Sequence, residues 1–466
     1  MNGPPRPRRR EMTIWRINRA VALLAMAGAI VAVQSASAQT AGAPGAGDPY
    51  YPLAGNGGYE VDHYGLHLKA RPKVDRVKAT ATINATATQS LSSFNLDFRG
   101  LRVSSATVDG TRAAVARRGG EMTVTAAQPI AFGAHFVAVV AYRGRPRPIG
   151  GVGWIRTHDG TAVFSEPTGS PSWFPCNDSP SDKASYSFTV TVPRRYRAIA
   201  NGQLDPVERR RGTATFAWHE TRPMATYLAT VTVGHFRIKP STVDGVPAWT
   251  AVAPGQGRRS RSLRKLSRII ALYSDRFGPY PFSSAGSIVV PGKSETALET
   301  QTRPVYLGAP IPLVVAHETA HQWFGDAVTP ASWSDIWLNE GFATWSQWMW
   351  SSGGDDKRLR RTFKLYFRPK AALGVRHFWM VPPGNPGRQA LFSFPVYYRG
   401  AMTLEALREK VGDATFYSIL RKWVAQHRYG SATTRQFIAL AQATAGVPLE
   451  HFFGLWLFEP RKPTGW

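Results

Sequence analysis

Residues 316–325 of this chain read Ala-His-Glu-Thr-Ala-His-Gln-Trp-Phe-Gly. Pro312 stands shortly before this stretch and favours the start of a helix, because its missing N–H group is not needed in a first turn. Residues four apart share one face of a helix, so His317 and His321 can present two ring nitrogens to one metal ion. Glu318 then reaches over the open side of that ion. The stretch therefore predicts a metal-binding helix.

A catalytic zinc ion needs a third protein ligand and one open position for water. The run from Trp333 to Thr344 predicts a second helix and supplies Glu340, with 18 residues between His321 and Glu340. That gap is long enough for the chain to turn and pack antiparallel. A third histidine at the metzincin spacing is absent, because that position is Ala327. Two histidines and one glutamate remain as the predicted ligands.

A competing interpretation is a surface helix whose His and Glu side chains are solvated. Both predicted helices are too apolar for this, because eight large hydrophobic residues surround the three ligands: Val314, Val315, Trp323, Phe324, Trp337, Leu338, Phe342 and Trp345. Ionisable groups buried among such neighbours need a partner to offset their desolvation. We therefore expect one zinc ion per chain.

The two halves of the chain follow different periodicities. Residues 39–58 are rich in Gly, Ala and Pro and predict a flexible lead-in. Residues 59–243 contain short runs of alternating apolar and polar residues separated by turn residues, which is typical of an all-β domain. Residues 244–466 follow helical periods. A hydrophobic content of 43% with 15 Trp, 16 Tyr and 23 Phe excludes a disordered chain.

Residues 1–38 have the features of an export signal. Six arginines precede an apolar run of 14 residues, 20–33, and Ala36 and Ala38 provide small residues for a signal peptidase. The run is shorter than the roughly 20 residues that a membrane-spanning helix needs. We expect cleavage after Ala38 and a secreted, periplasmic or envelope location. The export route stays open.

The chain is strongly basic, with a formal charge of +27, and loss of the six Arg and one Glu in 1–38 leaves +22. The basic residues are scattered and no nucleic-acid motif accompanies them, so we expect a solvated surface and no specific nucleic acid. A weak electrostatic association with an acidic cell envelope is a further hypothesis. The single cysteine, Cys176, excludes an internal disulfide. The oligomeric state is not predicted.

The metal motif and three other stretches resemble the aminopeptidase N family of gluzincin peptidases. The other stretches are 277–282 (Phe-Gly-Pro-Tyr-Pro-Phe), 298–302 (Leu-Glu-Thr-Gln-Thr) and 173–178 (Trp-Phe-Pro-Cys-Asn-Asp). The resemblance implies an α+β multidomain protein with an N-terminal all-β, saddle-like domain and a mainly helical, thermolysin-like catalytic domain. We expect the family's usual C-terminal helical domain to be missing, as in short two-domain bacterial members.

The resemblance also implies substrate-binding residues. The family's Gly-Ala-Met-Glu-Asn motif is Thr-Ala-Leu-Glu-Thr at 296–300, so Glu299 corresponds to the glutamate that binds the substrate's free amino group. Glu166, 12 residues before Asp178, corresponds to a second contact with the amine. The family's Tyr-x-Lys-Gly motif matches 397–400 with Arg for Lys, which implies Tyr397 as the oxyanion donor and leaves Tyr398 as a competitor.

These assignments predict a zinc aminopeptidase. Glu318 is the expected base, Tyr397 stabilises the oxyanion, and Glu299 and Glu166 bind peptides with a free N-terminus. One alternative is a metallo-endopeptidase with the same zinc site, which the altered 296–300 stretch leaves open. Another, from a different class, is an inactive zinc-containing binding protein. The preferred N-terminal side chain and the physiological peptide are not predicted.

Overall fold

The computed structural model describes residues 1, 3, 39–294, 296–368 and 377–465. Most of the predicted export signal, residues 2 and 4–38, therefore lies outside the described residues. Within the described ranges, no helix is long and apolar enough to cross a membrane.

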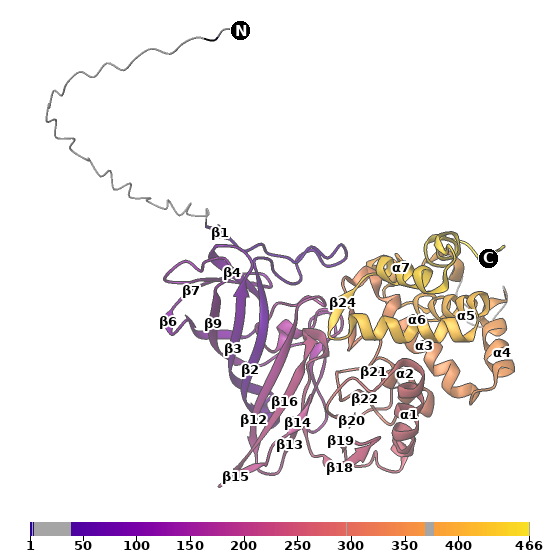
Figure 1. The fold of residues 1–466 in the computed structure, drawn as a ribbon. Coiled ribbons are helices and arrows are strands. Elements are labelled where there is room, and N and C mark those ends of the chain that lie inside the picture. The colour runs from indigo at the N-terminus through magenta and orange to yellow at the C-terminus, as the bar shows by residue number, and fades with distance from the viewer. Residues whose placement is uncertain (2, 4–38, 295, 369–376, 466) are drawn as a thin grey trace. The chain divides into compact units, whose positions relative to one another are not determined.

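The N-terminal half is built on strands (Figure 1). Its largest sheet has nine strands in the order β14-β16-β12-β2-β3-β9-β5-β6, with β15 paired to β16. Burial alternates along its long strands, as the predicted period of two requires. These strands are β2 (Tyr59–Arg71), β3 (Arg76–Ala87), β5 (Arg102–Val108), β6 (Thr111–Arg112), β9 (His135–Gly144), β12 (Lys183–Pro193), β14 (Gln203–Leu204), β15 (Glu208–Arg210) and β16 (Thr213–Ala225).

Two four-stranded sheets complete this half, in the orders β1-β4-β8-β7 and β10-β11-β17-β13. Their strands are β1 (Thr40–Ala41), β4 (Leu91–Asp97), β7 (Ala114–Arg118), β8 (Glu121–Thr125), β10 (Gly153–Arg156), β11 (Thr161–Phe164), β13 (Arg197–Ala200) and β17 (Val231–Gly234). The loop after β11 contains Glu166, and a loop after β13 reaches the catalytic half through Asn201.

The catalytic half begins with a five-stranded sheet in the order β18-β19-β20-β22-β21. Its strands are β18 (Arg237–Val243), β19 (Val246–Val252), β20 (Ala285–Val290), β21 (Ala297–Leu298) and β22 (Val305–Leu307). β18 and β19 form an antiparallel hairpin. The boundary that we predict at residues 243 and 244 falls in the turn of this hairpin, and β18 therefore joins the sheet of the catalytic half.

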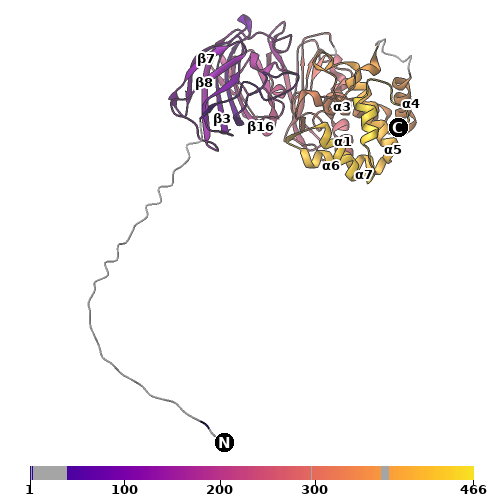
Figure 2. The ribbon, with the colours of Figure 1, turned by 90° about the horizontal axis from the view of Figure 1, so that it is seen from above.

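Helices dominate the rest of the catalytic half, and Figure 2 shows them gathered away from the strands β3, β7 and β8. They are α1 (Leu266–Phe277), α2 (Pro312–Ala320), α3 (Trp337–Ser352), α4 (Asp356–Phe367), α5 (Gly400–Val411), α6 (Asp413–His427), α7 (Thr434–Ala445) and α8 (Glu450–Phe453). A short parallel pair, β23 (Val328–Pro330) and β24 (Gly430–Ala432), links the chain after α2 to the chain after α6. α3 is buried along most of its length, so it forms the centre of this half.

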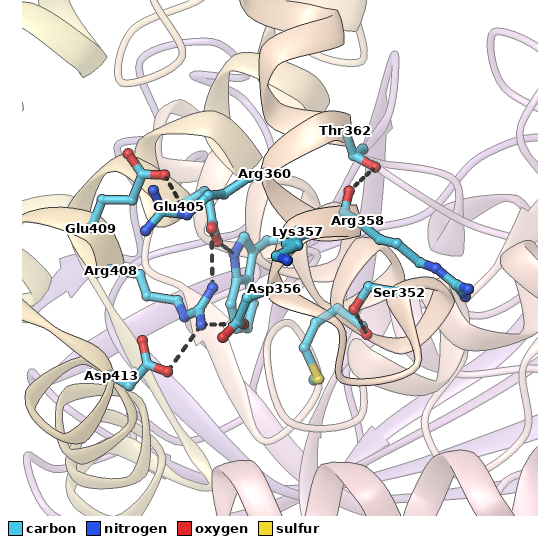
Figure 3. A network of polar contacts seen from close by, with 12 residues as sticks. Ser352, Asp356, Lys357, Arg358, Arg360, Thr362, Glu405, Arg408, Glu409 and Asp413 are labelled. Carbon is cyan, nitrogen blue, oxygen red and sulfur yellow. Dashed lines mark hydrogen bonds and ion pairs between the residues drawn. The ribbon is translucent and has the colours of Figure 1, made fainter.

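A buried arginine ties four of these helices together (Figure 3). The Arg408 guanidinium on α5 binds Asp356 of α4 at 2.6 Å, Asp413 of α6 at 3.0 Å and Glu405 at 3.1 Å. The indole N–H of Trp345 on α3 donates to the other oxygen of Glu405 at 2.9 Å. This network fixes the middle of α3 relative to α4, α5 and α6.

The lead-in is held to both halves of the chain. Strand β1 pairs with β4. The Asp48 carboxylate, 8% exposed, accepts hydrogen bonds from the backbone N–H groups of Tyr50 and Tyr51 and, in the catalytic half, from the Trp333 N–H and the Ser332 hydroxyl. Residues 39–58, which we predict to be flexible from composition, thus contribute ordered contacts to the fold.

Candidate active site

Helix α2 and the start of α3 bring the three predicted metal ligands together. His317 Nε2 lies 3.2 Å from Glu340 Oε2, and His321 Nε2 lies 3.5 Å from the same oxygen. One ligand atom from each of the three residues lies within 4.8 Å of the others. The predicted ligand set therefore converges on one point.

Close packing between glycines sets the position of α3. A Cβ atom on Gly341, the residue after Glu340, would lie 2.9 Å from the Cα of Gly400 at the start of α5. Such a contact is too short for real Cβ atoms, so only glycines permit it. Phe324, just after the end of α2, and Phe342 on α3 then pack with ring centroids 4.9 Å apart at an interplanar angle of 42°.

The donor set fits a catalytic zinc ion. Two imidazole nitrogens and one carboxylate oxygen are the ligands that such a site uses, with a fourth position left open. His321 Nδ1 lies 3.1 Å from the Phe324 carbonyl oxygen, so the ring donates there and leaves Nε2 free for a metal. Burial alone would raise the pKa of Glu340, but the charge of His321 and hydrogen bonds from both histidines hold it at about 2. Glu340 is therefore an ionised ligand.

Glu318 faces the same space without a protein partner. It is 7% exposed, and no described residue donates a hydrogen bond to its carboxylate. Burial raises the pKa of Glu318 well above its usual range, and the positive charge of His321 opposes that rise. A carboxylate in this state can take up a proton and release it again, as a general base must.

Glu299 lies at the start of a turn that Gln322, just after the end of α2, holds in place. The Gln322 side-chain amide donates to the Glu299 carbonyl at 3.0 Å and to Asp326 Oδ2 at 2.7 Å, and its oxygen accepts from the Thr302 N–H at 2.7 Å. Gln322 immediately follows the ligand His321. The metal motif and the Glu299 turn are therefore one rigid unit.

A buried arginine holds the other side of this turn. Arg303 is fully buried against the rings of Trp218 and Trp249, with its guanidinium carbon 5.1 and 5.4 Å from their centroids. It donates only to uncharged oxygens, including the carbonyls of Ala200 and Ala285. Sequence reasoning missed Arg303 and Gln322 as supports of the site. The sequence offered one signal, the position of Gln322 beside the ligand His321. It offered none for Arg303, because the acceptors of its hydrogen bonds are distant in sequence.

Glu166 contributes a further carboxylate from the β-rich half. Its Oε1 is buried and has no hydrogen-bond partner. Burial and the charges of Glu299 and Glu340 raise the pKa of Glu166 well above its usual range. Glu299 is similar: it is 2% exposed, its Oε1 is also unpartnered, and burial raises its pKa. The structure thus places Glu166 and Glu299, the two residues predicted to bind the substrate's amine, near enough to the metal ligands to interact with them electrostatically.

The two candidate tyrosines occupy different environments. The Tyr397 ring lies 5.9 Å from the His317 ring, at an interplanar angle of 21°. Tyr398 instead packs among Trp348, Tyr366 and Phe394, with centroid distances of 6.1, 4.5 and 5.6 Å. Both lie in a π-helical turn, 395–399, a geometry that is frequent at functional sites. Tyr397 is the one beside the metal ligands.

Comparison with known proteins defines the class. Residues 60–228 match the Peptidase M1 N-terminal domain and residues 261–456 match the Peptidase family M1 domain. A solved M1 zinc metallopeptidase from Deinococcus radiodurans, a mutant form, is 31% identical, with a TM-score of 0.83 over 90% of this chain and 99% of that one. A two-domain M1 zinc metallopeptidase bound to L-arginine is 30% identical, with a TM-score of 0.84 and the same coverage.

The chain belongs to peptidase family M1, and His317, His321 and Glu340 have the geometry of that family's zinc site. Aminopeptidase M1 of Arabidopsis thaliana is 26% identical over 326 residues, which are 64% of this chain and 36% of that protein. Tricorn protease-interacting factor F2 of Thermoplasma acidophilum is 26% identical over 336 residues, 66% of this chain and 42% of that protein. The chain thus matches less than half the length of these relatives.

These findings confirm the family, the zinc cofactor and the fold class predicted from the sequence. A β-rich N-terminal domain precedes a catalytic domain, as expected. The catalytic domain, predicted to be mainly helical, also contains the five-stranded sheet from β18 to β22, so it is a mixed domain.

Proposed function

We propose that this M1 peptidase is an aminopeptidase that removes the N-terminal residue from peptides with a free amino group. The observation that carries this proposal is the pair of buried, unpartnered oxygens on Glu299 and Glu166, close to the metal ligands. Two such carboxylates attract an ammonium group, which forms charge-assisted hydrogen bonds to both. A peptide held in this way exposes its first peptide bond to the metal site.

The protein groups perform the proton transfers. A bound zinc ion supplies Lewis-acid chemistry by polarising the peptide carbonyl and acidifying a water molecule. Glu318 takes a proton from the attacking water and returns one to the leaving amine. The Tyr397 hydroxyl donates a hydrogen bond to the carbonyl oxygen as it gains negative charge. Burial and the nearby charge of Glu340 raise the pKa of Tyr397 well above its usual range, so the hydroxyl keeps its proton for this bond.

The test is hydrolysis of peptides in matched free and N-acetylated forms by the zinc-loaded protein, with Glu318→Gln as the blank. We expect only the free peptides to lose their first residue. Internal cleavage of acetylated peptides would contradict the proposal and favour the metallo-endopeptidase alternative, to which the departure of 296–300 from the family motif points. Zinc binding without hydrolysis of any peptide would favour the inactive binding protein.

Export is the second part of the proposal, and the basic start, apolar run and small residues of 1–38 support it. N-terminal sequencing of the protein from an expressing cell's exported fraction should begin at Gln39. Retention of the apolar run in a cytoplasmic protein would contradict export. Envelope association, suggested by the +22 charge of residues 39–466, should weaken as salt increases; binding that is insensitive to salt would contradict it.

A further inference from the structure

A row of four cations crosses the exposed face of the largest sheet. Lys69 of β2 lies directly opposite Lys78 of β3, and Lys78 lies opposite Arg143 of β9. Arg143 in turn lies opposite Arg102 of β5. All four residues are exposed, and because neighbouring strands are about 4.8 Å apart, the row is roughly 14 Å long. Like charges at directly opposite positions destabilise a sheet, so the fold alone does not account for this row.

The turns at the same end of the sheet add six more cations. They lie at the β2–β3 turn, in the segment after β9 and at the end of β10, and four of them line a cavity of about 290 Å³. Asp75 is the carboxylate in that lining, and it accepts a hydrogen bond from the Trp154 indole at 3.4 Å. We call the row and these six residues the basic platform: Lys69, Arg71, Lys73, Arg76, Lys78, Arg102, Arg143, Arg145, Arg147 and Arg156.

The chain supplies little counter-charge to this platform. All ten residues are exposed, and among the described residues none of them forms an ion pair with an Asp or Glu. Arg408 shows the opposite arrangement, with three carboxylates around one guanidinium. Basic residues that are scattered along the sequence therefore converge on one surface, where their charges are available to an external anion.

The platform lies far from the catalytic half. Lys183, at the start of β12, donates from Nζ to the Asp326 carbonyl at 2.8 Å and to the Gly430 carbonyl at 3.3 Å. Thr191, eight residues further along the same strand, lies opposite Lys69 of the platform. At 3.3 Å per residue, these two ends of β12 are about 26 Å apart. A partner that covers the platform therefore leaves the active site accessible.

The charge and the breadth of the platform indicate the kind of partner. One small anion would contact only a few of the ten cations, which extend over four strands and the turns beside them. Val74, 47% exposed, lies in the β2–β3 turn and adds an apolar side chain to the platform. Clustered basic residues are attracted to anionic lipids, and apolar side chains among them can enter the headgroup layer. The surface of an anionic membrane matches these features.

We propose that the basic platform docks the protein on the phosphate headgroups of an anionic membrane and leaves the active site open to peptides. The proposal rests on the envelope association proposed above, which it assigns to one surface. Binding to vesicles depends neither on export nor on peptide hydrolysis. A protein that is retained in the cytoplasm or does not cut peptides would therefore contradict the proposed function without affecting this result.

The experiment is co-sedimentation of the full chain with vesicles of phosphatidylglycerol or of phosphatidylcholine. The test variant, Lys78→Gln with Arg143→Gln, removes two cations from the centre of the row. The control, Arg361→Gln with Lys364→Gln, removes one Arg and one Lys from exposed positions of α4, so both variants have the same net charge. Binding of the test variant to phosphatidylglycerol should fall by about 25-fold, because each basic residue at an anionic surface contributes about fivefold. The control should bind like wild type.

Phosphatidylcholine vesicles measure any binding through the apolar run 20–33, which all the proteins share. Equal losses in the two variants would overturn the proposal, because the attraction would then depend on net charge alone. Failure of wild type to bind phosphatidylglycerol would also overturn it. Binding to double-stranded DNA that the test variant loses, without binding to vesicles, would contradict the membrane as partner and assign the platform to a nucleic acid.

Circular dichroism shows whether the test variant folds. Its unfolding midpoint should equal or exceed that of wild type, because two like charges are removed from opposite positions in the sheet. If it does not fold, Arg145→Gln with Arg147→Gln, in the segment after β9, takes its place with the same expected loss of binding. Undiminished binding by this second variant would overturn the platform.

Discussion

Two groups of buried carboxylates in this molecule differ in the hydrogen bonds that they accept. In the β-rich half, Asp97 Oδ2 accepts hydrogen bonds from the Gly55 N–H at 3.1 Å, the Asn56 side-chain amide at 3.0 Å and the Asp178 N–H at 2.9 Å. In the catalytic half, Glu299 and Glu318 accept no hydrogen bond from another described residue. Both groups are buried, so burial alone does not distinguish them.

The neighbours of Asp97 also accept hydrogen bonds from the protein. Asp178 Oδ1 accepts from the Thr226 hydroxyl at 2.6 Å, although its Oδ2 is buried without a partner, and Asp182 accepts from the Val61 N–H at 3.1 Å and from the Asn177 amide. These bonds join the lead-in, β2 and the 173–178 signature. A buried carboxylate whose oxygens the protein itself satisfies stabilises the fold, whereas one left without donors is available for a metal or a substrate.

Glu318→Gln should have the largest effect. The amide keeps the shape of the side chain but cannot take a proton, so peptide hydrolysis should fall by about 10³-fold to 10⁴-fold. Zinc content should stay at one ion per chain, because Glu318 is not a predicted ligand. The paired measurement is turnover and bound zinc on the same sample, with Glu208→Gln as the control. Near wild-type turnover would remove Glu318 from the mechanism.

Tyr397→Phe should lower kcat by about 10²-fold to 10³-fold, the usual cost of losing one oxyanion donor. The matched variant is Tyr398→Phe, which changes the neighbouring ring within the aromatic packing of Trp348 and Tyr366. It should change kcat little. If the two variants exchange these results, the oxyanion role belongs to Tyr398.

Asp97→Ala should act on the fold instead. The substitution leaves three buried donors unpartnered, and at roughly 1 kcal/mol each the free energy of unfolding should fall by about 3 kcal/mol. Urea denaturation followed by circular dichroism measures this loss. Asp62→Ala, an exposed aspartate on β2, is the control. A loss no larger than in the control would mean that these bonds do not stabilise the β-rich half.

Asp178→Asn should change how stability depends on pH. Burial raises the pKa of Asp178 to about 7, above its usual value of about 3.9 in an unfolded chain. Between these values the native protein holds a proton that the unfolded chain has lost, so wild-type stability falls as pH rises toward 7.

The asparagine variant lacks this titration. Relative to wild type, it should gain about 2 kcal/mol of stability between pH 5 and pH 7, since each pH unit in this range corresponds to about 1.4 kcal/mol. Urea midpoints at both pH values test the difference. A constant difference between the two proteins would show that Asp178 does not titrate in this range.

Much of the site could be predicted because its information is local. The spacing of His317 and His321 follows from helix geometry, and the run around Glu340 is apolar enough to require a buried helix. The strands of the N-terminal half followed from their period of two, which burial along β3 and β12 reproduces. These features need only neighbouring residues.

Other features depend on contacts between distant residues, which a single sequence does not reveal. The approach of Gly341 to Gly400 positions α3 against α5. Nothing in the sequence distinguishes either glycine from a glycine in a turn. Nothing in the sequence distinguishes Arg303 from a surface arginine, because the carbonyl groups that surround it come from distant residues. The lead-in is rich in Gly, Ala and Pro, so composition predicted flexibility, whereas Asp48 anchors it by accepting hydrogen bonds from Trp333 and Ser332.

The most direct test of the contrast between the two groups is Glu299→Gln, measured for both unfolding and hydrolysis. The account predicts an unfolding midpoint equal to or above that of wild type, because a buried charge without a partner is removed. Hydrolysis of free peptides should fall by about 10-fold or more as the ammonium contact weakens. A lower unfolding midpoint with undiminished hydrolysis would contradict the account, because Glu299 would then serve the fold and not the substrate.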